Sequence, residues 1–288
     1  MQINRAVEIE EKIMRARAEY PALWRRLIRE WRMAESGNFA WLMYAANYLF
    51  FTGGVRWAMD PLSLSTRISG IPHPDYSADL EPLELVLLTH AHNDHLDLNL
   101  VNAIAGLPIQ WIVPEFMLAQ VLGAGVLQDN IIIPINGKAI DFKGLRITPF
   151  AGQHIHGRFG VPETGYLVEC SGKRWLFPGD TRIYDPGYLP DFGSVDAVFA
   201  HVWLGKACAD LPTPPLLDEF CRFYENFRAK RIILTHLDEL GRDEKDLWDD
   251  RHVRMITQKM EELHALNKVE ACFMGGIIDL DLPGKNAA

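Results

Sequence analysis

Apolar residues recur along the chain with two different periods, which predicts a mixture of helices and strands. Residues 5–35 carry large apolar side chains at helical spacing with arginines between them, and these apolar positions are Tyr20, Leu23, Trp24, Leu27, Ile28 and Trp31. A basic amphipathic helix can lie on a membrane surface or pack its apolar face on its own domain. We favour packing on the domain, with the helix ending at residues 36–38.

Shorter apolar runs follow this helix. They predict strands at 41–44, 48–52, 55–59, 85–88, 111–113, 131–133, 145–150, 165–170, 174–177, 197–200, 232–234, 269–273 and 277–280, and helices at 96–105, 115–122, 216–227 and 244–266. Gly53 and Gly54 predict a turn between the second and third strands. Because strands and helices alternate without a linker, we expect an α/β or α+β fold with layered sheets. We divide the chain into an N-terminal helical extension at 1–38, packed on one large domain at 39–288.

Composition narrows the choice of function. The chain has 288 residues, 48% of them hydrophobic, and a net charge of -9. The negative net charge argues against a protein that binds the phosphates of nucleic acid. The negative net charge does not exclude a small anionic substrate, because bound metal ions can dominate the electrostatic field inside a pocket. The four cysteines form no CxxC pair, so we expect neither a cysteine zinc site nor a disulfide framework. No signal peptide or spanning segment is evident, and we expect a cytoplasmic protein with no transmembrane segment.

Two apolar strands end in the same way. Residues 86–90 read VLLTH and residues 232–236 read IILTH, so each strand presents a histidine at its end. Strand ends are common places for chemistry in α/β folds. The echo predicts two similar halves that contribute His90 and His236 to one site.

The densest group of chemical side chains follows the first of these strands. Residues 89–97 read THAHNDHLD, with three imidazoles and a carboxylate within six residues. An extended stretch directs alternate residues to one side, so His90, His92 and Asp94 can converge, and a turn brings His95 round. Imidazole and carboxylate are ligands for zinc, iron or manganese. The sequence therefore predicts a metal site here.

The HxHxDH arrangement resembles the signature of the metallo-β-lactamase superfamily. That resemblance requires another histidine after a later strand, an aspartate in a Gly-Asp turn and a final histidine after a strand. The sequence supplies His154, Asp180 and His236 in that order. The resemblance implies a four-layer αββα sandwich, with residues 39–288 as the catalytic domain.

The resemblance also implies a dinuclear site. One ion would be held by His90, His92 and His154, a second by Asp94, His95 and His236, and Asp180 would bridge the two ions. The expected cofactors are two divalent metal ions, with zinc as the default and manganese or iron as alternatives. The expected function is a metal-dependent hydrolase that uses a metal-bridging hydroxide to cleave a small ester, lactone or phosphoester.

Within the superfamily, the chain most resembles the branch of L-ascorbate-6-phosphate lactonase and N-acyl-phosphatidylethanolamine phospholipase D. Residues 89–97, and the N-terminal helix followed by residues 39–42, resemble the lactonase. The Gln153-His154 element followed by Gly157-Arg158 resembles the phospholipase. The expected partner is a small anionic molecule, and the sequence leaves open whether the chain forms a homo-oligomer.

Several residues receive roles within this hypothesis. Asp94 is placed to orient the hydroxide or relay a proton, and His201, at a strand end, is a candidate acid for the leaving group with a structural role as the alternative. Arg158 and Arg182 are candidates for binding an anionic group, or for salt bridges, and Lys206 is a weaker candidate. Asp97 is a candidate acceptor for the N–H of a ligand imidazole, with a solvated helix-start residue as the alternative.

The remaining histidines have simpler interpretations. His156 lies two residues from His154 and competes with it as a ligand, although the family spacing favours His154. His73 lies among prolines and is expected in a loop. His252 and His264 fall on the polar C-terminal helix and are expected at the surface.

Three other functions compete with the hydrolase of a small ester. The superfamily includes nucleases, so a metal-dependent phosphodiesterase or nuclease is one alternative. A non-catalytic metal-binding sensor is another alternative. It is disfavoured because the sequence contains all seven ligands that the resemblance requires. A redox role is disfavoured because no flavodoxin-like partner domain is evident.

Overall fold

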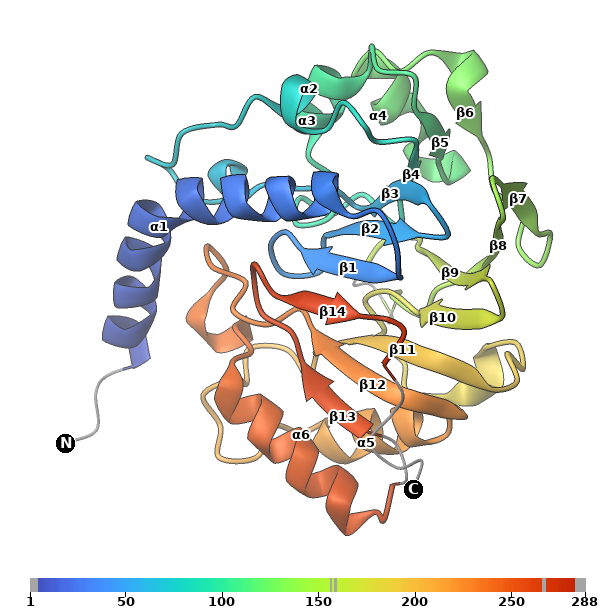
Figure 1. Cartoon of the computed structure of the whole chain (residues 1–288). Helices are drawn as coiled ribbons and strands as arrows, with labels where there is room; N and C mark the ends of the chain where they lie inside the picture. Colours follow the sequence, from blue (N-terminus) through green and yellow to red (C-terminus); the bar gives the residue numbers. More distant parts are fainter. Residues whose placement is uncertain (1–4, 156, 158–159, 266–267, 283–288) are drawn as a thin grey trace.

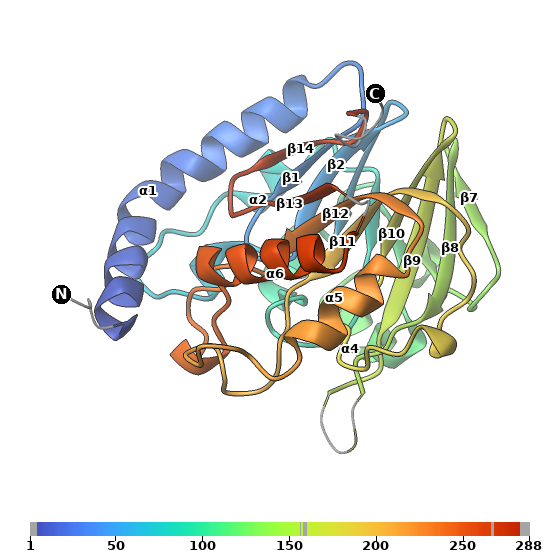
Figure 2. The same ribbon diagram turned by 90° about the horizontal axis from the view of Figure 1, so that it is seen from below.

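The computed structural model describes residues 5–155, 157, 160–265 and 268–282. Two seven-stranded sheets face each other, with helices on both outer sides, so the fold is the expected four-layer sandwich (Figures 1 and 2). The first sheet has the order β14-β1-β2-β3-β4-β5-β6 and the second the order β13-β12-β11-β10-β9-β8-β7. In each sheet, three antiparallel pairings at one end are followed by three parallel pairings, so the two sheets have similar topology. The two strands that end in LTH are not equivalent in this arrangement, because the strand before His90 is the second of its parallel set and the strand before His236 is the third.

The first sheet is antiparallel at one end and parallel from β3 to β6. Its strands are β1 (Phe39–Leu42), β2 (Tyr48–Thr52), β3 (Val55–Met59), β4 (Leu85–Leu87), β5 (Gln110–Ile112), β6 (Ile131–Ile132) and β14 (Ile277–Asp279). Gly53 and Gly54 both have positive φ and form the expected turn between β2 and β3.

The second sheet is parallel from β10 to β13 and antiparallel from β7 to β10. Its strands are β7 (Ile140–Phe142), β8 (Leu145–Ala151), β9 (Thr164–Cys170), β10 (Lys173–Phe177), β11 (Val195–His201), β12 (Ala229–Thr235) and β13 (Lys268–Ala271). The sequence pattern did not predict β7, a half-exposed strand of three residues, because so short a run shows no clear alternation.

Six α-helices cover the outer faces of the described sandwich. They are α1 (Arg5–Met33), α2 (Tyr76–Asp79), α3 (Leu98–Ile104), α4 (Leu118–Gly123), α5 (Leu217–Glu225) and α6 (Asp250–Glu262). The first four pack on the first sheet, and α5 and α6 lie below the second sheet in Figure 1. None of these helices combines the length and the apolar character needed to cross a membrane.

Helix α1 packs its apolar face on the domain, as expected. Trp24 and Trp31 are buried, and the Trp31 indole N–H donates to the carbonyl of Phe50 in β2 at 2.9 Å. The packing explains why a helix with many arginines stays on the sheet. Whether residues 1–38 form a unit distinct from 39–288 stays a prediction.

The prediction of a helix over residues 244–266 was wrong at both ends. Residues 244–246 form a separate 3-10 turn, and α6 begins only after Asp249, whose side chain accepts from the Arg251 amide. His252 completes this cap, because its ring accepts from the Asp249 amide at 3.0 Å. The expectation that His252 is exposed was therefore also wrong, since it is fully buried, whereas His264 is exposed as expected.

The buried anchor of α1 yields a stability prediction. Trp31→Ala should lower the free energy of unfolding by about 3–5 kcal/mol, because it leaves a large cavity and removes the hydrogen bond to the Phe50 carbonyl. Arg25→Ala, on the exposed side of the same helix, should change it by less than about 0.5 kcal/mol. Urea unfolding of both variants tests this, and equal stabilities would mean that α1 is not part of the core.

Candidate metal centre

The candidate site lies where the ends of strands from both sheets meet. His90 follows β4, Asp180 follows β10, and His236 directly follows β12. His154 comes three residues after the antiparallel strand β8. Because the parallel strands of each sheet end at the same edge, side chains far apart in sequence gather in one place.

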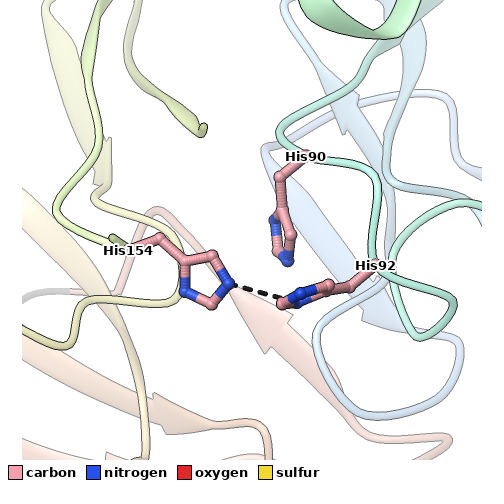
Figure 3. Close-up of side chains that lie close together, drawn as sticks. All are labelled: His90, His92 and His154. Carbon is pink, nitrogen blue, oxygen red and sulfur yellow. Dashed lines mark hydrogen bonds between the residues drawn. The ribbon is translucent and has the colours of Figure 1, made fainter. Parts of the chain in front are cut away.

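Three histidines form a first group within this site. Ligand atoms of His90, His92 and His154 all lie within 4.8 Å of one another. Figure 3 shows the rings of His92 and His154 facing each other, with Nδ1 of His92 3.1 Å from Nε2 of His154. His90 and His154 are fully buried, whereas His92 is half-buried, so the group approaches the surface at His92.

Two aspartates and two histidines form a second group. Ligand atoms of Asp94, His95, Asp180 and His236 also lie within 4.8 Å of one another, and all four residues are buried. Nε2 of His236 is 3.4 Å from Oδ2 of Asp94. His236 has a positive φ of 64°, a strained conformation for a residue other than glycine, and its amide donates to the Ala45 carbonyl.

Asp180 lies between the two groups. Its Oδ2 is 3.9 Å from Nε2 of His90 in the first group and 3.6 Å from Nε2 of His236 in the second. Its Oδ1 is 3.3 Å from Nε2 of His95. Asp180 therefore lies within 4 Å of histidine nitrogens from both groups.

Four atoms that converge here have no hydrogen-bond partner among the described residues. They are Nε2 of His90, His95 and His236, and Oδ2 of Asp94, and all are buried. Leaving a buried polar atom unpaired costs free energy, so such a concentration requires an explanation. Imidazole nitrogens and carboxylate oxygens gathered within 4.8 Å of one another, as in the two groups, fit divalent metal ions of the zinc, manganese or iron type.

The electrostatics of the two groups differ. Burial lowers the pKa of His90 to about 3 and of His92 and His154 to about 4, so all three rings are neutral near pH 7. Burial opposes protonation of His95 as well, but the Asp180 carboxylate outweighs it and raises the pKa well above its usual value. The second group is thus the more negative environment and suits a cation.

Asp60, at the end of β3, supports the second group. Its Oδ2 accepts from the hydroxyl of Thr89 at 2.5 Å and lies 2.8 Å from Nδ1 of His95, while its Oδ1 accepts from the Thr89 amide. In the neutral ring, which is the form that binds a metal ion, a proton on Nδ1 of His95 leaves the Nε2 lone pair directed into the site. Asp60 therefore fixes both the orientation and the tautomer of this ring.

Glu163 supports the first group in the same way. Its Oε1 is 3.1 Å from Nδ1 of His90 and accepts from the Asp180 amide at 2.8 Å. Burial raises the pKa of this carboxyl group to about 7. Two glycines make room for it, since a Cβ at Gly179 or Gly152 would come within 2.6 Å of the Glu163 side chain.

His201 contacts Asp180 rather than the converging atoms. Its Nδ1 is 2.8 Å from Oδ1 of Asp180, and its Nε2 is 3.1 Å from the hydroxyl of Tyr48. Both ring nitrogens have partners, and the residue is only 3% exposed. This favours the structural alternative for His201, the positioning of Asp180, over proton donation to a leaving group.

The other predicted residues have mixed outcomes. The proposed link of Asp97 to a ligand imidazole was wrong, because its carboxylate caps α3 by accepting from the amides of Asn99 and Leu100. Arg182 is described and stacks over Trp203 at 5.5 Å. His156 and Arg158 lie outside the described residues. His73 lies in a loop, as expected.

Sequence reasoning missed the acidic supports of the site: Asp60, Glu163 and Glu239. Glu239 lies 3.6 Å from Nε2 of His236 and is held by Arg67 and Arg242. Lone acidic residues carry little signal in a sequence. The one sequence signal available for Asp60 was its position directly after an apolar strand, similar to the position of His90 three residues after the end of β4.

Comparisons with known proteins agree with this geometry. The family model described as "Beta-lactamase superfamily domain" matches residues 60–237, more than half of the chain. The chain belongs to this superfamily. The match begins at Asp60 and ends one residue after His236, so it spans all seven predicted ligands.

Two curated relatives resemble parts of the chain. An N-acyl-phosphatidylethanolamine-hydrolyzing phospholipase D of Caenorhabditis elegans is 30% identical over 53% of this chain and 49% of its own length. A UPF0173 metal-dependent hydrolase of Deinococcus radiodurans is 28% identical over 40% of this chain and 50% of its own. The match spans about half the length of each relative.

A solved structure extends the comparison to most of the fold. Igni18, a metallo hydrolase from the archaeon Ignicoccus hospitalis, aligns with 83% of this chain and 97% of its own, at a TM-score of 0.59 and 18% identity. At this identity the likeness shows the fold alone. The chain is thus a member of the beta-lactamase superfamily with the fold of its metal-dependent hydrolases.

The close approach at Gly179 yields a prediction. Gly179 has φ +82°, and an added Cβ would lie 2.4 Å from the Glu163 carboxylate. Gly172 has φ +78°, and an added Cβ would meet nothing within 4 Å. Both alanine variants incur the backbone cost of about 1 kcal/mol, but Gly179→Ala should lose about 1–3 kcal/mol more through overpacking. Thermal or urea unfolding measures the difference, and equal losses would contradict the proposed role of Gly179.

Proposed function

We propose that the chain is a metal-dependent hydrolase that cleaves a small ester, lactone or phosphoester at a centre of two divalent ions. The observation that carries the proposal is the convergence of buried, unpaired imidazole nitrogens from both sheets. Bound there, the ions would supply Lewis acidity and lower the pKa of water, so that a nucleophile becomes available near neutral pH.

The ligand assignment follows the two groups. His90, His92 and His154 would hold one ion, Asp94, His95 and His236 the other, and Asp180 would contact both. The distances of Asp180 Oδ2 to His90 and His236 support a shared position. Zinc is the default ion for this set, with manganese or iron as alternatives.

We propose that Asp94 accepts the proton of the attacking water. Its buried Oδ2 has no hydrogen-bond partner among the described residues and faces His236 at 3.4 Å. The Asn47 side chain donates to the Asp94 backbone carbonyl at 2.8 Å and so fixes the loop that carries it. Asp94 would orient the attacking water and accept its proton, while His201 would position Asp180 rather than act as an acid.

The substrate is proposed to be a small anionic molecule. Arg182 lies next to the site and is a proposed contact for an anionic group, as is Arg158 from the sequence alone. One relative is named for hydrolysis of a phospholipid, which supports the inclusion of phosphoesters in any search. The complete ligand set supports catalysis over a sensor role. Cytoplasmic location and oligomeric state stay predictions.

Metal content tests the ligand assignment first. Protein purified without chelator should contain about two transition-metal ions per chain, and His92→Ala should contain fewer because the first group loses a ligand. His73→Ala removes an exposed loop histidine and should leave the content unchanged. Elemental analysis measures all three proteins. A wild type that binds no transition metal after reconstitution would overturn the assignment and the hydrolase with it.

Activity tests the proposed chemistry. The metal-loaded protein should hydrolyse at least one compound in a panel of lactones, phosphodiesters and phosphomonoesters. Asp94→Asn keeps the shape of the side chain but removes the proton acceptor, so kcat should fall by about 10²–10⁴-fold. Metal content of the variant must be measured alongside, since Asp94 is also a proposed ligand. An Asp94→Asn enzyme with full metal content and full activity would exclude Asp94 as the proton acceptor.

A further inference from the structure

A second feature lies beside the metal centre: a cavity of about 500 Å³. This volume is in the range of sites for small organic ligands. Its apolar wall consists of Trp203, Pro215 and Leu216, and three cationic side chains also line it, namely Arg182, Lys206 and Arg242. The cavity therefore combines an apolar surface with positive charge.

The walls of the cavity come from the loops that carry the site. Arg182 follows Asp180 by two residues, and its amide donates to the carbonyl of Gln153, the neighbour of His154. Trp203 follows His201 by two residues. Arg242 lies in the loop after His236, with a guanidinium nitrogen 4.0 Å from Oδ2 of Asp94. The cavity therefore adjoins the reacting centre.

The charge in this cavity is opposite to that of the whole chain. Three cations line it against one acid, Asp246, whose Oδ1 accepts from the Ala207 amide at 2.6 Å. The chain as a whole carries a net charge of -9. A concave site lined by one sign of charge concentrates ligands of the opposite sign.

Side-chain contacts hold the two arginines of the cavity in place. Arg242 is bonded to Glu239, a carboxylate only 2% exposed, which also accepts from Arg67 at 3.2 Å. Arg182 is stacked over the ring of Trp203 with its guanidinium carbon 5.5 Å from the ring centre. Guanidinium groups fixed in this way lose little freedom when they bind an oxyanion.

We infer that this cavity is a subsite for a phosphate or carboxylate group that is attached to an apolar body and is separate from the bond to be cleaved. The anion contacts Arg182 and Lys206, with Arg242 between the anion and Asp94, and the apolar body lies against Trp203 and Leu216. The anion-binding site itself does not depend on the proposed function. Only the identification of the bound molecule as a substrate rests on the proposed hydrolase.

Binding of phenyl phosphate to the metal-loaded protein tests the subsite by calorimetry. Arg182→Gln should weaken binding by about tenfold and Lys206→Gln by about threefold, because each removes one charged contact. Lys138→Gln removes an exposed lysine outside the cavity and should change nothing. Equal metal content in all proteins ensures that direct contact of phosphate with the ions is the same. Phenol should bind far more weakly than phenyl phosphate, and benzoate in the same assay compares carboxylate with phosphate.

Two results would overturn the subsite. One is wild-type affinity for phenyl phosphate and benzoate in both cavity variants, and the other is an equal loss in Lys138→Gln. Hydrolysis of a neutral lactone separates the two proposals. If it proceeds while Arg182→Gln binds phenyl phosphate normally, the subsite alone fails. If no compound is hydrolysed but Arg182→Gln weakens binding, the hydrolase fails and the anion site stands.

Discussion

The structure is organised around a single buried carboxylate, Asp180. Its two oxygens lie between 2.8 and 3.9 Å from nitrogens of four histidines that come from both sheets, namely His90, His95, His201 and His236. Burial alone would raise the pKa of Asp180, but His236 and His95 outweigh it and hold the pKa well below its usual range. A buried anion is tolerated only with such partners, so the ends of both sheets must meet here in register.

The histidines around Asp180 are themselves held by a second set of buried carboxylates. Asp60 supports His95, Glu163 supports His90, and Glu239 lies between His236 and Arg242. Each support has its own constraint, such as the glycine at 179 that leaves space for Glu163. The aromatic core between the sheets, where Phe50 stacks on Trp57 at 3.8 Å, keeps the strand ends fixed relative to one another. Precision at the site therefore depends on packing well away from it.

Local sequence predicted the parts of the site that are local. His90, His92, Asp94 and His95 could be found because they lie within six residues. The fold followed from the family resemblance and is confirmed by the two facing sheets. The division into two ligand groups also came from the resemblance and stays a prediction. The supports could not be found, since Asp60 meets a partner 35 residues away and Glu163 meets one 73 residues away. For Asp97 the sequence left two roles open, and the structure agrees with the one at the helix start, because the carboxylate accepts from the amides of Asn99 and Leu100.

The supporting carboxylates and the cavity residues differ in how freely they can be substituted. The supporting carboxylates are buried against strand ends, where a change would disturb the histidines they orient. The cavity is instead lined by side chains from three surface-reaching loops, and Lys206 and half-buried Arg182 can change without loss of a proposed ligand. Arg242 is the exception, since one guanidinium contacts the buried Glu239, approaches Asp94 and lines the cavity. The positive charge of the cavity is thus coupled through this side chain to the position of Asp94, so a change at Arg242 would alter the cavity and the candidate metal centre together.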